Sequence, residues 1–445
     1  MLKDFKVAFV HLQKELMIKT VFWFRRDLRL YDNCALYHAL QNGDVLPVFI
    51  FDTSILSQLE KDDARVSFIY KALQQIQTQL QQLGKSLAVF HGNPVTVFEQ
   101  LVQAYPITQV YTNHDYEPKA RKRDLEINNL LKKHRIAFKT CKDQVIFEKD
   151  EVVKNDGTPY VVFTPYANKW KEKLAVTSLG YYNSENLLET IVLHHYPFPD
   201  LETIGFTPSV IKVPLYDITK PLLSHYTARR DYPAIQGTSQ LSTHLRFGTI
   251  SIRNIVKQAL DHNAGVFLNE LIWREFFMQI LWHFPYTVHK SFKAKYDHIQ
   301  WMNNEIQFEK WCNGTTGYPI VDAGMRELNA TGLMHNRVRM ITASFLCKHL
   351  LIDWRWGETY FASKLLDYEQ ASNVGNWQWA AGSGVDAAPY FRIFNPEEQM
   401  KKFDKSQVYI RQWVPEIGTQ NYPEPVINHK EARERCLKIY KAAVG

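Results

Sequence analysis

The residues KTVFWF, at positions 19–24, form a short run rich in β-branched and aromatic side chains and are followed by two arginines. This composition predicts a buried β-strand. Four further runs of this kind follow along the chain. Longer amphipathic stretches, such as residues 65–83, lie between the runs. These runs are VLPVFIF (45–51), LAVFHG (87–92), QVYTN (109–113) and IAFKT (136–140). Strands separated by helices of this length predict an α/β domain with a doubly wound parallel sheet over residues 18–145.

Two further regions follow this domain. Residues 146–215 lose regular spacing and are rich in Pro, Gly, Asn and Thr, which indicates an interdomain linker packed across both domains. From residue 216 to residue 445 the apolar residues recur at helical spacing, most clearly at 267–284 and 325–354. The second domain is therefore predicted to be all-α. Residues 1–17 are mixed and charged, and we interpret them as an N-terminal extension.

The composition is that of a soluble globular protein, with 45% hydrophobic and 22% charged residues in 445. No apolar run reaches the roughly 18 residues of a membrane helix, and no secretory cleavage site is visible. We therefore expect a cytoplasmic protein that does not bind membranes. The net charge of +7 suits an anionic partner such as nucleic acid, although many enzymes have such a charge without one.

The five cysteines are widely spaced in the sequence and include no CxxC pair. They are Cys34, Cys141, Cys312, Cys347 and Cys436. An odd, dispersed set predicts thiols in a reducing compartment. It also argues against a zinc site or a four-cysteine iron–sulfur cluster, so no metal is expected.

Common catalytic motifs are missing: the chain has no GxSxG, no HExxH and no GxxxxGK[ST]. If the protein is an enzyme, a cofactor should supply its difficult chemistry. The segment GTSQLSTHL (237–245) places Thr238, Ser239 and Ser242 where a helix begins. Hydroxyls and unpaired N–H groups at a helix start can bind phosphate. An ordinary N-cap explains the same pattern and remains an alternative.

The segment NWQWAAG (376–382) places Trp377 and Trp379 two residues apart. On a helix such residues point roughly 200° apart, so the two indoles cannot share a face. One is expected to face the core and the other a cavity.

Five segments together resemble the photolyase/cryptochrome family. They are FWFRRDLRLYDNCAL (22–36), GTSQLSTHLRFG (237–248), NELIWREFF (269–277), GYPIVDAGMRELNATGLMHNRVRM (317–340) and NWQWAAGSGVDAAPYFRIFNP (376–396). The resemblance covers residues 18 to 415 and is strongest to the bacterial class I cyclobutane pyrimidine dimer photolyases. It implies an α/β antenna domain joined by a long linker to a helical FAD domain, in agreement with the pattern above.

The resemblance implies a set of FAD-binding residues. Those that would hold the phosphates are Tyr226, Thr238, Ser239, Gln240, Leu241 and Ser242. Asp367, Tyr368 and Glu369 would contact the flavin side, and Asn373 would face the flavin N5. The family more often has Asp where this chain has Glu369.

The resemblance also assigns roles to five tryptophans. Trp377, Trp354 and Trp301 match an electron-relay chain that runs from the flavin to the surface. Trp379 and Trp273 match the two rings that line the substrate cavity. The expected substrate is a pyrimidine dimer extruded from DNA, as base-flipping enzymes require.

Three further positions match catalytic and substrate-binding groups of the family, and Asn373 belongs to the same catalytic set. Glu270 and Asn336 would bind the polar edges of the dimer, and Glu270 would stabilise its radical anion. Met340 stands where the (6-4) photolyases have a proton-donating His, and a thioether cannot donate a proton. Residues matching positions near the DNA strand are Arg230, Glu270, Trp273, Arg274, Asn336, Arg337, Trp379, Arg392 and Gln399.

The implied function is a deoxyribodipyrimidine photolyase, a monomer in which blue or near-UV light drives electron transfer from fully reduced FAD to cyclobutane pyrimidine dimers in DNA. Two alternatives remain: a cryptochrome-type blue-light photoreceptor and a flavoprotein with ordinary redox chemistry. The segment NHDYE (113–117) resembles the folate-contacting segment of relatives that bind 5,10-methenyltetrahydrofolate as antenna chromophore. A deazaflavin or an empty antenna site are the alternatives.

Overall fold

The structure is a computed structural model that describes residues 18–444. The N-terminal extension predicted for residues 1–17 lies outside the described residues. The chain divides into two compact units, which are described separately below. Unit 1 comprises residues 18–146, 179–210 and 244–255 of the described chain, and unit 2 comprises residues 147–178, 211–243 and 256–444.

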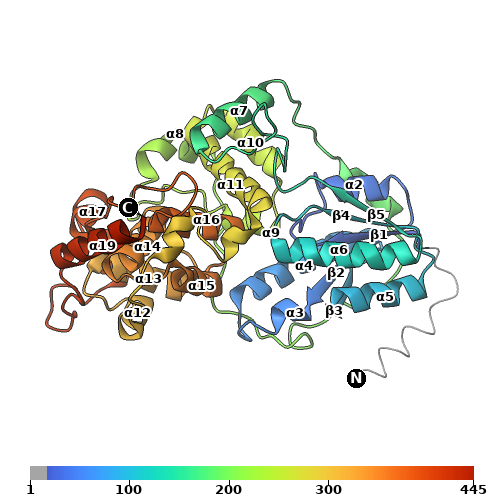
Figure 1. Ribbon diagram of the computed structural model, residues 1–445. Helices are drawn as coiled ribbons and strands as arrows, with labels where there is room; N and C mark the ends of the chain where they lie inside the picture. The colour runs from blue at the N-terminus through green and yellow to red at the C-terminus, as the bar shows by residue number, and fades with distance from the viewer. Residues whose placement is uncertain (1–17, 445) are drawn as a thin grey trace. The chain divides into compact units, whose positions relative to one another are not determined.

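Unit 1 contains a five-stranded parallel sheet with the order β3-β2-β1-β4-β5 (Figure 1). All five predicted strands are present: β1 (Thr20–Phe24), β2 (Val45–Asp52), β3 (Ala88–Gly92), β4 (Gln109–Asn113) and β5 (Ala137–Cys141). The helices of this unit are α2 (Cys34–Leu40), α3 (Thr53–Leu56), α4 (Ala64–Gln81), α5 (Pro94–Ala104), α6 (Pro118–Lys133) and the 3₁₀ helix η1 (Ser184–Thr190).

Alternation along β1 explains why the sheet is covered on both faces. Phe22 and Phe24 belong to the core that includes residues of α2 and α4. Val21 and Trp23 point to the opposite face and belong to the core that includes residues of α5 and α6. Because successive strand residues face opposite sides, a continuous apolar run is what a doubly covered strand requires. The predicted doubly wound domain is thus confirmed.

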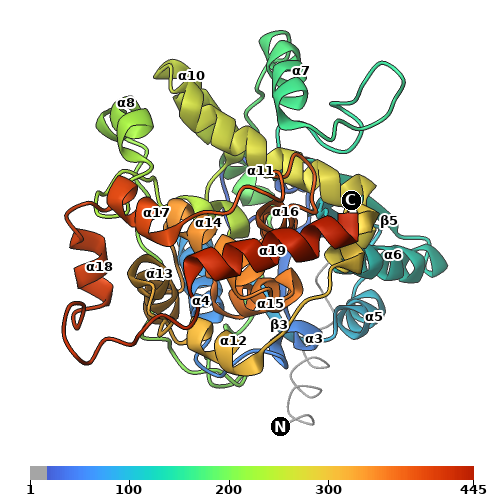
Figure 2. The same cartoon turned by 60° about the vertical axis from the view of Figure 1, so that its left-hand side comes forward.

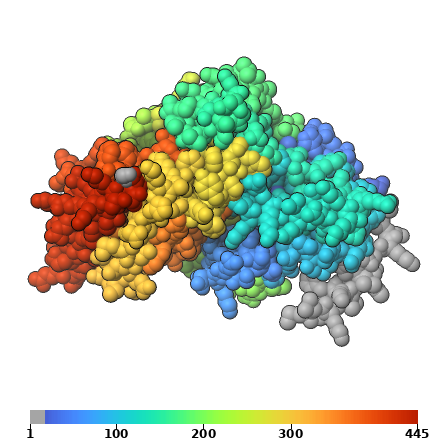
Figure 3. Space-filling model, viewed as in Figure 1, coloured from blue at the N-terminus to red at the C-terminus, as the bar shows by residue number. Residues whose placement is uncertain are grey.

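Unit 2 is helical in its regular structure. Its helices are α7 (Phe163–Ala175), α8 (Lys220–Arg229), α11 (Gly265–His283), η2 (Pro285–Val288), η3 (Ala294–His298), α12 (Glu305–Cys312), α13 (Pro319–Thr331), α14 (Asn336–Ser344), the π-helical turn η4 (Phe345–His349), α15 (Trp354–Lys364), α16 (Gln370–Ala381), α17 (Pro396–Phe403), α18 (Val408–Trp413) and α19 (His429–Val444). Helices α9 (Ser242–Phe247) and α10 (Ile252–Asp261) span the boundaries between the units. Helix α19 is labelled in Figure 2, and its Cys436 and Tyr440 belong to one core with Ile299 and Leu351. Residues near the end of the described chain form a continuous stretch of surface, red in Figure 3.

The predicted helical stretch 325–354 is divided in the structure. Helix α13 ends at Gly332, whose φ of 70° is a left-handed conformation that glycine adopts without strain. Helix α14 then starts after His335, whose side chain accepts a hydrogen bond from the N–H of Arg337. Periodicity continues through such a break because the apolar residues of both helices face one core.

The compact units do not coincide with the divisions drawn from the sequence. The segment 146–215, interpreted as one linker, is shared between the units, and it contains α7 and η1. Residues 244–255 group with the sheet although they follow the start of the helical pattern. Sequence spacing reports only near neighbours, so it cannot reveal such a return of the chain. Among residues 18–444, no helix has the length and apolar character needed to cross a membrane.

Candidate functional site

Helix α11 presents three of the predicted DNA-binding residues on one face. Glu270, Trp273 and Arg274 are spaced i, i+3 and i+4, which places their side chains side by side on a helix. All three are partly exposed, whereas the opposite side of the helix is buried. The Arg230 guanidinium, at the end of α8, donates a hydrogen bond to the Glu270 carboxylate over 2.5 Å.

The end of α8 connects α11 with α14. Arg230 binds Glu270 of α11, and the next residue, Asp231, accepts a hydrogen bond of 2.7 Å from Arg337 of α14. Arg337 also lies 3.6 Å from the sulfur of Met340. These residues, predicted separately from distant motifs, are therefore brought together in unit 2.

Asn336 and Met340 are spaced i, i+4 on α14 and therefore lie on the same side of that helix. Asn336 is exposed, and its amide makes no hydrogen bond to residues 18–444. The exposed amide of Asn336 can bind a polar edge of a substrate. The neighbouring thioether of Met340 cannot donate a proton, as predicted for this position.

The charge of Arg230 is favoured by this arrangement. Burial opposes the charge, but the hydrogen bond and the negative charge of Glu270 outweigh it and raise the pKa of the guanidinium. The guanidinium also lies over the ring of Tyr226, 5.3 Å from its centroid. Burial, followed by the charge of Glu270, raises the pKa of Tyr226 to about 12, so its hydroxyl remains a hydrogen-bond donor at neutral pH.

Trp273 has a neighbour that the sequence did not indicate. The ring of Phe163, the first residue of α7, stacks on Trp273 with 3.7 Å between centroids and an interplanar angle of 4°. Phe163 therefore fixes the orientation of the indole. Trp379 is also partly buried. Within residues 18–444 the rings of Trp273 and Trp379 are not in contact, as two walls of one cavity require, but the cavity itself stays a prediction.

The loop before α9 has the chemistry of a phosphate site. In the described part of the chain, none of the backbone N–H groups of residues 238–242 donates a hydrogen bond to the protein. Gln240 is in the left-handed region, with φ of 54°, and successive N–H groups in such a turn can surround an anion. A Cβ at Gly237 would lie 2.6 Å from the Cβ of Arg229, so the loop packs tightly on α8. These residues fit the diphosphate of FAD.

The predicted flavin-side residues are fixed by ion pairs and hydrogen bonds. Arg339 donates to Asp367 over 2.9 and 3.1 Å, and Arg274 lies 3.3 Å from the carboxylate of Glu369. Asn373 donates to the carboxylate of Glu358 over 3.0 Å. Tyr368 also donates to that carboxylate, over 3.3 Å. Glu369 is therefore charge-paired, although the family more often has Asp there.

Sequence reasoning missed Arg339 and Glu358. Arg339 lies inside the motif 317–340, so its signal was present but was assigned to other residues. Glu358 lies on α15 and has no local signal, because its role depends on Asn373 of α16. Burial raises the pKa of Glu358, and the hydrogen bonds from Asn373 and Tyr368 only partly oppose this.

Trp377 is buried in the core of unit 2. Its indole packs edge-on against Phe361 at 5.0 Å and against Trp311 at 6.1 Å between ring centroids. Gly357 provides the space, since a Cβ there would lie 2.1 Å from the Trp377 ring. Trp354 is on the same helix as Gly357, one turn earlier, and is buried in the same core.

Trp301 is partly exposed and packs against this core, with its ring edge-on to Tyr440 at 6.0 Å. The order from buried Trp377 and Trp354 to partly exposed Trp301 agrees with the predicted relay, while the transfer itself stays a prediction. Trp311, a further buried indole in ring contact with Trp377, was not predicted.

Arg392 and Gln399, also predicted to bind DNA, make no hydrogen bond or ring contact with the other predicted DNA-binding residues within residues 18–444. Arg392 is exposed and lies over the ring of Phe394, 5.7 Å from its centroid. Gln399 lies on α17, where its N–H donates to Asn395. The exposed Arg392 and the partly exposed Gln399 suit contact with an external strand, but among the described residues neither contacts the Arg230–Glu270 pair.

Comparison with known proteins identifies the family. Residues 20–183 match the family described as DNA photolyase, and residues 267–419 match the FAD binding domain of DNA photolyase. Deoxyribodipyrimidine photo-lyases from Escherichia coli K12 and Alkalihalophilus pseudofirmus are 38% and 37% identical, over 95% and 94% of this chain and 98% and 97% of those proteins.

Solved structures agree with this result. A bacterial class III photolyase from Agrobacterium tumefaciens is 32% identical, with a TM-score of 0.85 and coverage of 98% of this chain and 99% of that one. A cryptochrome from Synechocystis is 25% identical, with a TM-score of 0.84 and coverage of 96% and 100%. A sheet domain and a helical flavin domain define a class of light-dependent flavoproteins. The chain belongs to the DNA photolyase family.

Proposed function

We propose that this protein is a deoxyribodipyrimidine photolyase that repairs cyclobutane pyrimidine dimers, of the class I type. The observation that supports this best is the arrangement around the end of α8. There Arg230 and Asp231 bind Glu270 and Arg337, and Trp273 lies on the same helix face as Glu270. Carboxylate, amide, cationic and aromatic groups in one region suit a substrate with polar edges and apolar faces.

Bound FAD in its fully reduced form supplies the light-driven electron that opens the cyclobutane ring. The loop 237–242 would hold its diphosphate through backbone N–H groups and hydroxyls. Glu358 fixes the side chain of Asn373 by accepting its amide hydrogens at 3.0 Å and, through its backbone carbonyl, at 3.1 Å, and Asn373 would contact the flavin N5.

The substrate-binding groups divide into two kinds. Glu270 and Asn336 bind the polar edges of the dimer, and Glu270 stabilises the negative charge that the dimer gains. Trp379 contacts its faces together with the part of the Trp273 ring that Phe163 does not cover, and Met340 closes a wall. Because Met340 cannot donate a proton, the site favours cyclobutane dimers over (6-4) photoproducts.

One experiment separates repair from signalling. The purified FAD-loaded protein is reduced, mixed with an oligonucleotide that contains one thymine dimer, and illuminated with blue light. Restoration of the two thymines, with none in the dark control, is expected. Bound FAD without repair would favour a cryptochrome-type photoreceptor, the alternative that the likeness to the Synechocystis protein supports.

For the antenna we propose a folate, 5,10-methenyltetrahydrofolate, in unit 1. Residues 113–117 follow β4 at the edge where the strand order reverses between β1 and β4, a common ligand position in such sheets. There Arg26 pairs with Asp115 at 3.3 Å and with Glu117 at 3.2 Å. Extraction of the purified protein under mild acid would yield a folate, whereas a deazaflavin or no second chromophore would contradict this assignment.

We also propose that the protein is monomeric and acts in the cytoplasm, without a metal in the repair reaction. A photolyase needs only one flavin and one dimer in its site, so one chain suffices. Light scattering at micromolar concentration would give the mass of one chain, and a stable dimer would contradict this part of the proposal.

A further inference from the structure

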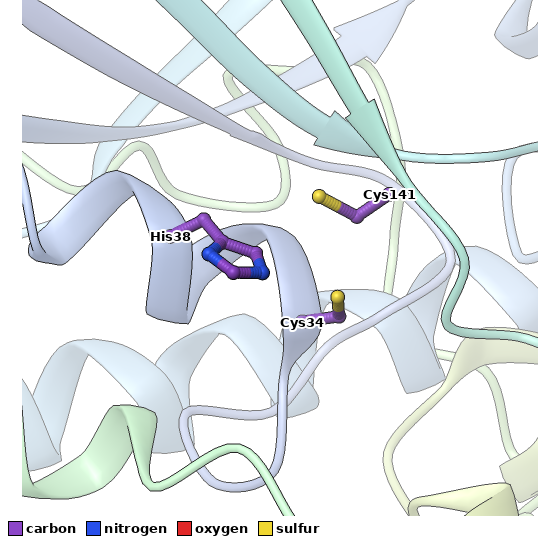
Figure 4. Close-up of side chains that lie close together, drawn as sticks. All are labelled: Cys34, His38 and Cys141. Atoms are coloured by element: carbon purple, nitrogen blue, oxygen red, sulfur yellow. The ribbon is translucent and has the colours of Figure 1, made fainter. Parts of the chain in front are cut away.

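Three side chains with metal-binding atoms lie together in unit 1, which does not contain the proposed repair residues. Cys34 is the first residue of α2, His38 lies one turn later on the same helix, and Cys141 is the last residue of β5. Their sulfur and ring nitrogen atoms all lie within 4.8 Å of one another (Figure 4). The wide sequence separation of the cysteines had argued against a zinc site, and the fold removes that argument for this pair.

The backbone that holds the two cysteines is firmly positioned. The N–H of Cys34 donates to Asp143 over 3.2 Å, and the carbonyl of Cys141 accepts from the N–H of His114 over 2.7 Å. Asp143 is buried and binds Arg29 at 2.7 Å and Arg253 at 2.8 Å. The backbone positions of both cysteines are therefore fixed.

His38 strengthens the resemblance to a metal site. It is only half-buried, and its ring lies against the rings of Tyr37 and Tyr182 at 5.4 and 5.8 Å between centroids. Neither ring nitrogen of His38 makes a hydrogen bond to residues 18–444. A histidine held by ring contacts, with its nitrogens available beside two thiols, is what a metal ligand requires.

We propose that Cys34, His38 and Cys141 bind a zinc ion, with a water molecule as fourth ligand. Zinc takes thiolate sulfur at about 2.3 Å and imidazole nitrogen at about 2.0–2.1 Å in tetrahedral geometry. Ligand atoms of such a site are about 3.5–3.8 Å apart. The observed separations, up to 4.8 Å, thus need only a shift of about 1 Å, within reach of small side-chain rotations.

The bound ion would be structural. It would join the helix after β1 to β5, which is an edge strand of the sheet with one neighbour, β4. A disulfide between Cys34 and Cys141 is the competing use of the two thiols. A disulfide would not explain why the His38 ring nitrogens lie beside the two thiols, so we favour zinc.

The test uses the full-length FAD-loaded protein. Its cysteine thiols are kept reduced, and any metal is removed with a chelator. Zinc is titrated against a chromophoric competitor, and native mass spectrometry gives the stoichiometry. One zinc per chain is expected. Cobalt in place of zinc should give the visible absorption of a tetrahedral thiolate site.

Single substitutions test each ligand. Cys34→Ser, His38→Gln and Cys141→Ser should each weaken zinc binding by more than about tenfold, since even groups that only orient ligands have effects of that size. Cys312→Ser and His262→Gln, in unit 2, are the matched controls and should bind zinc as the wild type does. Circular dichroism checks that all variants are folded.

Two results would overturn the proposal. One is that the wild type binds no zinc, or that the three ligand variants bind zinc as tightly as the wild type does. The other is a Cys34–Cys141 disulfide found by peptide mapping in protein purified without reductant, with no zinc bound.

Discussion

The Arg230 guanidinium and the Glu270 carboxylate form a 2.5 Å hydrogen bond that joins the end of α8 to the middle of α11. Both side chains remain partly accessible, at 20% and 34% of their full exposure. An ion pair with this much access to solvent can exchange partners, so Glu270 can turn from Arg230 to a bound pyrimidine edge. Because Arg230 also covers Tyr226, the pair links the predicted substrate residues to a predicted flavin residue.

Substitution of Glu270 should separate repair from cofactor binding. Glu270→Ala removes an acceptor for the dimer and is expected to lower the repair yield about tenfold or more, as loss of a charge-assisted hydrogen bond does. FAD content should fall much less. Repair of a thymine-dimer oligonucleotide and flavin absorbance measure the two effects. Glu434→Ala, at an exposed position on α19, is the control, and equal yields in both variants would exclude Glu270 from the mechanism.

Gly357 should control the position of Trp377. Gly357→Ala places a Cβ about 2.1 Å from the Trp377 ring, so the indole or the helix must shift. We expect a loss of about 1–3 kcal/mol in the free energy of unfolding. Light-driven reduction of the flavin should also slow, because Trp377 begins the predicted relay.

The control for this change is Gly265→Ala at the start of α11, where a Cβ would meet nothing within 4 Å. It should be neutral or stabilise by about 0.4–1 kcal/mol, through the unfolded chain. Urea unfolding and flavin photoreduction measure both variants. Similar behaviour of the two alanine variants would contradict the packing argument.

The partly buried carboxyl of Glu358 should make stability depend on pH. Burial raises its pKa above the ordinary value of 4.5, so the folded chain keeps a proton that the unfolded chain releases. Stability is therefore lost as the pH rises through the range above 4.5. Glu358→Gln lacks this loss.

The measurement is urea unfolding of the FAD-loaded wild type and Glu358→Gln at several pH values from 4.5 upward. The stability of the variant relative to the wild type should increase with pH. Glu434→Gln, at an exposed position, is the comparison. A difference that stays constant, or decreases with pH, would show that Glu358 is not held in its protonated form.

Exposed Arg392 should contribute to DNA affinity mainly through phosphate. If it neutralises one phosphate, Arg392→Ala should reduce the slope of log affinity against log salt by about 0.9 on duplex DNA. The loss should be similar for damaged and undamaged strands. Fluorescence anisotropy at several salt concentrations measures this, with exposed Lys133→Ala on α6 as control. An unchanged slope for Arg392→Ala would remove this residue from the DNA contact.

Local sequence patterns were sufficient to predict the strands of the sheet. The five strands were predicted within about two residues of their observed ends, because alternation and β-branched content report the burial of each strand directly. The loop before α9 was predicted to bind phosphate because its hydroxyls precede a helix start, and these are also local features. Helix spacing showed that Trp377 and Trp379 face different ways, and Trp377 is buried while Trp379 is partly exposed.

The sequence by itself determined the fold class, the family and the positions of most residues predicted to bind FAD and DNA, since these depend on short motifs and periodicity. Only the tertiary structure decided which of them meet. The Arg230–Glu270 and Asp231–Arg337 pairs, the partly buried Glu358 beside Asn373, and the cluster of Cys34, His38 and Cys141 join residues of separate helices and strands. Spacing describes neighbours along one helix or strand, whereas such contacts depend on how separate elements pack.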